Sequence, residues 1–312
     1  MRTKPKKKRT KALYPKAILC ADLHMWHNPP RSRRDEDYAE TCLGKLQFIV
    51  DLQNKYPTHP PILIAGDIFE HPKPPYWFLN KVIQVIQSGR GETIAVAGQH
   101  DLPHHRLELI EDSGLSLLPI NLIMSPRDVV GCTGFDVVGF PYGAELLEKE
   151  EVNSSTVPTL ALAHVLAWEG RPPFSGAPAS GNASRIKKKM KGYDLIVCGD
   201  NHDPFQSGRL LNCGCLIRKN IDQVDYQPRI YEWMGGKEVN PVDVPICTGI
   251  HLEEIMQEEK EVRADLTAFV EALADTSIEV GVDFEENVRG LIAEQKIDKE
   301  VEDEIWQLIP KR

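Results

Sequence analysis

The sequence predicts a layered α/β fold in which short strands alternate with helices. Between about residues 16 and 165, apolar runs of strand length are separated by longer amphipathic stretches. The composition, with 41% hydrophobic and 27% charged residues, is ordinary for a soluble globular protein. The length of 312 residues is sufficient for one large domain and a smaller appendage. No apolar run approaches membrane-spanning length, so no membrane association is expected.

Six apolar runs are expected to form strands buried on both faces, because each is short, continuous and rich in Val, Ile, Leu or Ala. KAILCAD and PILIAGD flank the first expected helix, and TIAVAG follows the second. The remaining three are FDVVGF, TLALAH and DLIVCGD. By number, the six expected strands cover 16–22, 61–67, 93–98, 135–140, 159–164 and 194–200.

Two segments between the first three strands are expected to be helices. Residues 37–56 carry apolar side chains such as Leu43 and Leu46 at helical spacing. Residues 74–89 have Pro near the start and Gly after the end, which is typical of a helix. Residues 167–184, rich in Pro, Gly, Ser and Ala, are expected to form a long loop, and loops of this length are usually functional or mobile.

The last third of the chain has a different pattern. GRLLNCGCLIR and RIYEWMGGKEVNPVDVP, residues 208–218 and 229–245, have few helical signals and are expected to be antiparallel strands that cover one side of the sheet. After them the pattern becomes acidic and helical. The expected organisation is a disordered basic tail at 1–15, a main domain at 16–248 and an acidic helical module at 249–312.

The net charge of −9 is spread unevenly along the chain. The N-terminal MRTKPKKKRTKALYPK carries only basic charges, and such an arm could also hold a phosphate backbone or serve as a nuclear-import signal. RIKKKMKG at 185–192 is an internal candidate for a basic groove, although a solvated helix face is the plainer interpretation. Seven cysteines without a secretory signal indicate reduced thiols and a cytoplasmic location.

Five of the expected strands end in a side chain that can bind a metal ion. Because sites form at the carboxyl edge of α/β sheets, these side chains should converge. A lone strand-end Asp is usually a cap or turn residue, whereas five such ends in succession favour a metal centre. The strand ends carry Asp22 and His24, Asp67, Gln99 and His100, His164, and Asp200 and His202.

The chemistry of these donors indicates the kind of metal. With His100 left aside, three carboxylates, three imidazoles and one amide, without a thiolate, suit Mn²⁺, Mg²⁺ or Fe²⁺, and also accommodate Zn²⁺. Seven donors are too many for one tetrahedral ion. They suit two ions that share a bridging carboxylate at a separation of about 3.5–4 Å. The sequence therefore predicts two divalent metal ions, with Mn²⁺ foremost.

The order of these residues, DLH, GD, GQHD, H and GDNH, resembles the signature of the calcineurin-like metallophosphoesterases, which is usually D-x-H, G-D, G-N-H-D/E, H and G-H-x-H. The SbcD-type DNA repair exonucleases match best, because GDIFEHPKPP, LNCGCLIRKN and QPRIY resemble segments of that branch. The resemblance covers about residues 16–235. It implies a metallophosphoesterase-type β-sandwich flanked by helices. The small C-terminal helical module expected from the acidic pattern lies outside the resemblance.

Carried over position by position, the resemblance implies two metal sites. Gln99 stands where Asn is usual, and Asp200 stands where the first His of the last block is usual. Both departures fall on the second ion and are expected to change its affinity and metal preference. The implied ligands are Asp22, His24 and His202 for the first ion, Asp67 as the bridge, and Gln99, His164 and Asp200 for the second.

The same resemblance implies a mechanism. A bridging water made acidic by both cations attacks phosphorus in line, and His100 protonates the leaving oxygen. Glu70 is placed to orient His100, or is simply a surface carboxylate. The candidate substrate contacts are Arg218, His27, Lys187 and Lys188, with His104 and His105 beside the motif; each alone is equally compatible with an ordinary salt bridge or a solvated side chain.

The leading hypothesis is a metal-dependent phosphodiesterase that acts on DNA. A second hypothesis keeps the same site but gives it a small nucleotide or a phosphoprotein. A third is a catalytically weak scaffold that binds an SbcC-like ATPase partner through its acidic tail, and the presence of His100 argues against such decay. The basic segments favour DNA, whereas the overall acidity favours a smaller substrate. The oligomeric state stays open.

Overall fold

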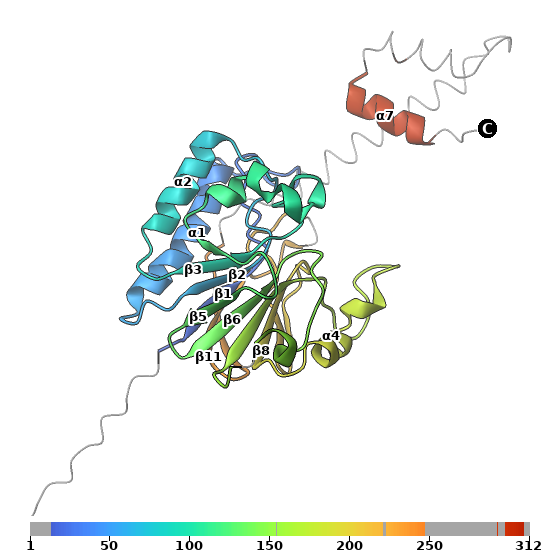
Figure 1. Ribbon diagram of the computed structural model, residues 1–312. Helices are drawn as coiled ribbons and strands as arrows, with labels where there is room; N and C mark the ends of the chain where they lie inside the picture. The colour runs from blue at the N-terminus through green and yellow to red at the C-terminus, as the bar shows by residue number, and fades with distance from the viewer. Residues whose placement is uncertain (1–13, 154, 221–222, 247–291, 293–296, 309–312) are drawn as a thin grey trace, which may run out of the picture. The chain divides into compact units, whose positions relative to one another are not determined.

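Two six-stranded β-sheets form the framework of the main unit (Figure 1). In spatial order, the first contains β12 (Glu238–Asp243), β11 (Arg229–Gly235), β1 (Ala17–Cys20), β2 (Ile62–Ala65), β3 (Thr93–Val96) and β4 (Asn121–Leu122). The second contains β5 (Val129–Cys132), β6 (Phe135–Phe140), β7 (Thr159–His164), β8 (Leu195–Gly199), β10 (Leu210–Asn212) and β9 (Phe205–Ser207). Both sheets are mixed, and the predicted fold class is confirmed.

The computed structural model describes residues 14–153, 155–220, 223–246, 292 and 297–308. The chain divides into two compact units, Met1–Glu253 and Glu254–Arg312. Most of the expected basic tail and of the expected helical module lies outside the described residues, although helix α7 (Lys299–Leu308) is described. Among the helices that are described, none is long and apolar enough to cross a lipid bilayer.

Alternate residues of the central strands face two different layers, as the strand period of two requires. In β1, Ile18 and Cys20 pack into the cluster that contains the helices of the first sheet. Leu19 faces the other way and shares the cluster between the sheets with Leu162 and Val197 of the second sheet. Because both faces are buried, these strands carry continuous apolar runs.

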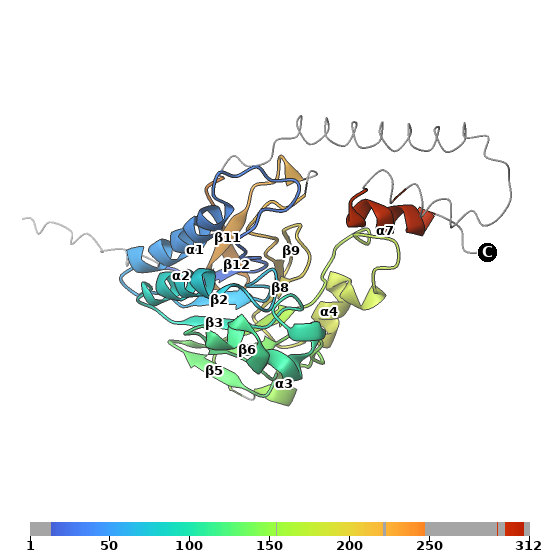
Figure 2. The same cartoon turned by 90° about the horizontal axis from the view of Figure 1, so that it is seen from above.

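Helices cover the outer face of each sheet (Figures 1 and 2). Helices α1 (Tyr38–Lys55) and α2 (Tyr76–Gln87) share one core cluster with the first sheet. Helix α4 (Ala183–Lys189) packs on the second sheet through Ile186. Asp37 caps α1 by accepting a hydrogen bond from the N–H of Glu40 at 2.9 Å. Shorter helical segments lie at α3 (Lys149–Val152), Pro103–His105, Leu107–Asp112, Gly114–Leu117 and Ala179–Gly181.

The expectation for the later strands is wrong in two respects. Residues 208–218 contribute only β10, which runs parallel to β8, because the chain first returns through the short β9. The β11–β12 hairpin is antiparallel as expected, but it extends the edge of the first sheet beside β1 and does not cover one side. The expected loop at 167–184 ends where the Asn182 side chain caps α4.

Candidate metal centre

Five strand ends, from both sheets, meet at one place. The sequence-based expectation is a sheet edge, and the structure shows that β1, β2 and β3 belong to one sheet while β7 and β8 belong to the other. The N–H of Asp22 donates to the carbonyl of Gly66 at 3.1 Å, and the N–H of His24 donates to the carbonyl of Asp67 at 3.0 Å. The N–H of Asp200 donates to both carboxylate oxygens of Asp22 at 3.0 Å, which joins the two sheets.

The first donor cluster consists of Asp22, His24 and His202, whose ligand atoms lie within 4.8 Å of one another. The Nε2 atoms of His24 and His202 are 3.0 Å apart. The other ring nitrogen of His24, Nδ1, lies 2.8 Å from the carboxylate of Glu70. That contact keeps the proton on Nδ1, so Nε2 offers its lone pair to a cation. These three residues are the set expected for the first ion.

Asp67 lies between the two halves of the site. Its Oδ2 is 3.9 Å from Nε2 of His24 and 3.5 Å from Nε2 of His164. Its Oδ1 accepts a hydrogen bond from the N–H of His100 at 2.9 Å. Oδ2 is buried and has no hydrogen-bond partner among the described residues. A buried carboxylate oxygen without a donor calls for an explanation, and a cation on either side would supply one.

The second donor cluster consists of Gln99, His164 and Asp200. His164 Nδ1 meets the carbonyl of Ala65 at 2.7 Å, so its Nε2 faces Oε1 of Gln99 at 2.6 Å. The amide nitrogen of Gln99 donates to Oδ1 of Asp200 at 2.7 Å. The two residues that depart from the expected motif therefore contact each other. The longer side chain of Gln99 reaches the shorter side chain of Asp200, and this contact keeps all three donors together.

Glu70 contacts two histidines, but not in the way that the sequence suggests. The ring of His100 donates from Nδ1 to the main-chain carbonyl of Glu70 at 2.9 Å. The Glu70 carboxylate instead lies 2.8 Å from His24 and 2.5 Å from Nζ of Lys219. Burial opposes its ionisation, but His24 and Lys219 lower its pKa to about 2. Glu70 therefore orients His100 through its backbone and His24 through its side chain.

The pKa values separate the histidines into neutral and charged ones. Burial lowers the pKa of His24, and burial together with the neighbouring His24 lowers the pKa of His202 to about 3. Both rings are therefore neutral at pH 7. Burial also opposes the charge on His164, but the carboxylates of Asp67 and Asp22 outweigh it and raise the pKa to about 10. A cation that bound here would replace this proton.

The two central carboxyl groups shift in opposite directions. Burial raises the pKa of Asp22 well above its usual range. Burial acts the same way on Asp67, but the charge of His164 prevails and holds the pKa of Asp67 below its usual range. Two buried carboxyl groups thus share one compensating histidine. The site is short of positive charge, which divalent cations would supply.

Four of the predicted ligands have a left-handed backbone. The φ angles are 50° at Asp22, 44° at His24, 50° at Asp67 and 85° at Asp200. For residues other than Gly such conformations cost about 1–3 kcal/mol each, and they cluster at functional sites. Here they turn the chain just after β1, β2 and β8, where these ligands are placed.

Replacing Gly66 with Ala is expected to destabilise the protein and to weaken metal binding. An added Cβ would lie 2.1 Å from Nδ1 and 2.9 Å from Cβ of His164, at a backbone φ of +88°. We expect a loss of about 2–5 kcal/mol, from the backbone strain and the displaced imidazole together. Urea unfolding of the metal-free protein and titration calorimetry with Mn²⁺ measure the two effects.

Gly134 provides the matched control for this substitution. Its φ is +83°, yet nothing lies within 4 Å of the position that a Cβ would take. Gly134→Ala therefore carries the backbone strain without the contact, and we expect a loss of about 1 kcal/mol with unchanged Mn²⁺ binding. Equal destabilisation by both substitutions would contradict the role given to the space beside His164.

Three of the predicted substrate residues are basic, and two of them have other partners. Arg218 is buried and donates from Nη1 to the carbonyl of Val224 at 2.6 Å. Lys187, on α4, donates from Nζ to the carbonyl and hydroxyl of Ser207 at 3.1 and 2.7 Å. Lys188 is exposed on the same helix. The 185–192 segment thus combines an exposed basic face with an apolar face that contacts the second sheet.

The histidines beside the motif lie in different surroundings. The ring of His27 packs between Trp26 and Trp77, at centroid distances of 4.6 and 5.9 Å. His104 and His105 are exposed and have φ angles of 55° and 56°. The structure therefore brings His27 into an aromatic group and leaves the other two at the surface.

Asp101 is a positioning residue that was not singled out from the sequence. It is fully buried, and its carboxylate accepts three main-chain N–H donors around Asp67. This arrangement holds the loop that presents Asp67 to the site. The sequence does contain a pattern that could identify it, because Asp101 is the last residue of the GQHD motif. The donors belong to Ile68, Phe69 and Gly98, at 3.2, 2.8 and 3.0 Å.

The residues present fit a pair of hard or borderline divalent cations. All the clustered donors are oxygen or imidazole nitrogen, and the described part of the site contains no thiolate. Three further observations also favour cations at this site. His24 and His202 are neutral, Oδ2 of Asp67 has no hydrogen-bond donor among the described residues, and the site has a deficit of positive charge. The assignment of single residues to single ions stays a prediction.

The family model of the calcineurin-like phosphoesterases matches residues 15–204, a range that contains every predicted ligand. Solved structures similar to this chain include a candidate 5′-nucleotidase of Staphylococcus aureus in complex with α-ketoglutarate (11% identity, TM-score 0.45, covering 80% of this chain and 58% of that one). Others are the protein TT1561 of Thermus thermophilus (11%, 0.45, 74% and 100%) and YfkN of Bacillus subtilis, a calcineurin-like phosphoesterase (13%, 0.40, 74% and 85%). This chain thus spans less than two thirds of the Staphylococcus aureus protein. No curated protein sequence matches it.

Proposed function

The chain belongs to the calcineurin-like phosphoesterase family, and we propose that it is an SbcD-type phosphodiesterase that hydrolyses DNA at a centre of two divalent metal ions. The family implies a phosphoester hydrolase. The observation that carries the proposal is the position of Asp67, whose Oδ2 lies within 4 Å of an imidazole from each donor cluster. We place the catalytic machinery in residues 16–248. Mn²⁺ is the proposed metal, because the donors are mostly oxygen and imidazole.

In this proposal Asp22, His24 and His202 would hold one ion, the second donor cluster would hold the other, and Asp67 would contact both. When bound, the ions supply Lewis acidity for the phosphoryl oxygens and for a nucleophilic water. His100 is the proton donor. Its Nδ1 is fixed on the carbonyl of Glu70 at 2.9 Å, so Nε2 is the atom that gives a proton to the leaving oxygen.

An aromatic row beside the first donor cluster supports a substrate that carries bases. The row consists of Trp26, His27, His71 and Trp77, and its neighbouring centroids are 4.6 to 5.9 Å apart. Trp77 is 50% exposed, and the adjacent Tyr76 is 83% exposed. Aromatic surfaces of this kind stack the bases of single-stranded nucleic acid. The row begins two residues after His24, so a strand bound there would extend from the reacting phosphate.

DNA cleavage by the metal-free protein is expected to depend on added Mn²⁺. With labelled single-stranded DNA, we expect the rate with Mn²⁺ to exceed the rate with EDTA at least about a hundredfold, since the ions provide several kcal/mol of transition-state stabilisation. Bis-p-nitrophenyl phosphate should be cleaved in the same conditions, and faster than p-nitrophenyl phosphate. Gel analysis of the DNA and absorbance of the released dye measure these rates.

Each other outcome of this assay selects a different function. Cleavage of the dye diester without cleavage of DNA would favour a small nucleotide substrate, and cleavage of the monoester alone would favour a phosphatase. No Mn²⁺-dependent turnover of any ester would favour the scaffold that binds an SbcC-like ATPase. The ATPase partner and the cytoplasmic location remain predictions.

A further inference from the structure

A cavity of about 340 Å³ opens directly beside the second donor cluster. Two of the predicted ligands, His164 and Asp200, form one of its walls. Tyr142, which is 37% exposed, also lines the cavity. The remaining walls are mainly apolar and include Phe140, Leu146, Leu166 and Pro178.

The position of Tyr142 is fixed from several directions. Its N–H donates to the carbonyl of Ala97 at 2.9 Å, at the end of the strand that leads to the GQHD motif. Its ring lies edge-on to His164 at a centroid distance of 6.4 Å, and tilted to His105 at the same distance. The ring is thus held beside the predicted ligands while part of it stays open to solvent. A half-open aromatic ring on a fixed backbone is suited to stacking.

The charge of the cavity indicates what it would bind. Among the described residues that line it there is no Lys or Arg, and its ionisable groups besides Tyr142 are the predicted metal ligands His164 and Asp200. A phosphate group would therefore be attracted to the cations and not to this cavity. A neutral, flat and largely apolar group would fit it, with the hydroxyl of Ser180 as a polar contact.

We propose that this cavity receives the nucleobase next to the scissile phosphate, with the face of the base on the ring of Tyr142. The proposal rests on the proposed function and narrows its substrate class. A base that enters a side cavity has left its neighbours in the strand, and unstacking is easiest in single strands and at frayed ends. Single-stranded DNA is therefore the preferred substrate, and it is cleaved faster than the same sequence in a duplex.

The stacking of a base on Tyr142 is tested by combining one change in the protein with one change in the substrate. Wild type and Tyr142→Ala are compared on thymidylyl-thymidine and on two dinucleotides that each lack one base. In wild type, loss of the accommodated base is expected to lower kcat/KM about 5- to 100-fold, the range of one stacking contact. Tyr142→Ala should lose a similar factor on the complete dinucleotide. On one of the base-free dinucleotides it should lose less than about threefold.

Two further variants separate stacking from folding. Tyr142→Phe keeps the ring and should lose less than about threefold on the complete dinucleotide. Phe174→Ala removes a ring that is 56% exposed and does not line the cavity, and its rates should equal those of wild type. Equal losses by Tyr142→Ala on the complete dinucleotide and on both base-free ones would overturn the proposal.

Failure of the proposed function is distinguishable from failure of this proposal. Wild type that cleaves no diester with Mn²⁺ would overturn the proposed function. In that case the base cavity is tested by binding alone, with 2-aminopurine deoxynucleoside monophosphate as the probe. Quenching of its fluorescence by wild type and Tyr142→Phe, but not by Tyr142→Ala, would support the cavity. The same quenching by all three proteins, or by none, would overturn it.

Discussion

Asp67→Asn is expected to abolish Mn²⁺-dependent diester hydrolysis, with a fall in kcat/KM of at least about a thousandfold. The amide keeps the size of the carboxylate, and its oxygen can still accept from the N–H of His100, which lies 2.9 Å from Oδ1. The other position would become an NH₂ group that faces Nε2 of His24 and of His164. The variant thus keeps the fold but loses the charge between the two donor clusters.

Calorimetry with Mn²⁺ separates this effect from misfolding. We expect wild type to bind two ions per chain and Asp67→Asn to bind at most one, with a similar urea unfolding midpoint in EDTA. Asp203→Asn is the matched control, because it makes the same change at an exposed carboxylate one residue after His202. An Asp67→Asn protein that binds two ions and keeps a tenth of the activity would exclude the bridging role.

The residues that the sequence could identify are those whose placement is local. Asp67 and His164 each end a short apolar run, and the end of a buried strand is an edge of the sheet whatever the rest of the chain does. The helices also carry their own signals, such as Asp37 at the start of α1. For the same reason, the chemical types of the strand-end donors, and from them the expectation of two ions, could be inferred from the sequence without the tertiary fold.

Contacts between distant segments could not be predicted in this way. Glu70 and Lys219 are 149 residues apart, and no local pattern pairs them. The alternation of strands and helices does not say which sheet a strand joins, so the convergence of two sheets was not foreseen. The contact between Gln99 and Asp200 is of the same kind. Two departures that look independent in the sequence are one paired arrangement in the structure.

His100→Ala is expected to slow the cleavage of DNA far more than the cleavage of bis-p-nitrophenyl phosphate. The alkoxide that leaves from DNA is strongly basic and needs a proton, and loss of a general acid costs about 10²–10⁴-fold. The p-nitrophenolate ion departs without a proton, so its release should slow less than about tenfold. Steady-state rates of both substrates with the same Mn²⁺ concentration measure the difference.

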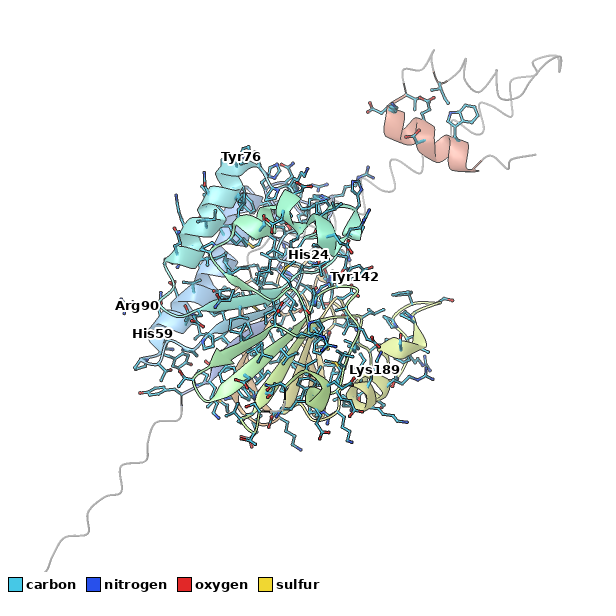
Figure 3. All side chains as sticks on the ribbon, in the orientation of Figure 1. His24, His59, Tyr76, Arg90, Tyr142 and Lys189 are labelled. Atoms are coloured by element: carbon cyan, nitrogen blue, oxygen red, sulfur yellow. The ribbon has the colours of Figure 1, made fainter. Side chains whose placement is uncertain are left out.

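The ratio of the two losses also decides between two roles for His100. One of its ring nitrogens lies within 4.8 Å of ligand atoms of His24 and Asp67, so His100 is placed to bind a cation as well as to donate a proton. Loss of a metal ligand would slow both substrates alike and would weaken Mn²⁺ binding in calorimetry. Loss of a proton donor would do neither. His59→Ala, at a histidine far from His24 (Figure 3), should change none of these quantities. An equal loss of rate on both substrates would therefore show that His100 is a metal ligand and that it does not protonate the leaving oxygen.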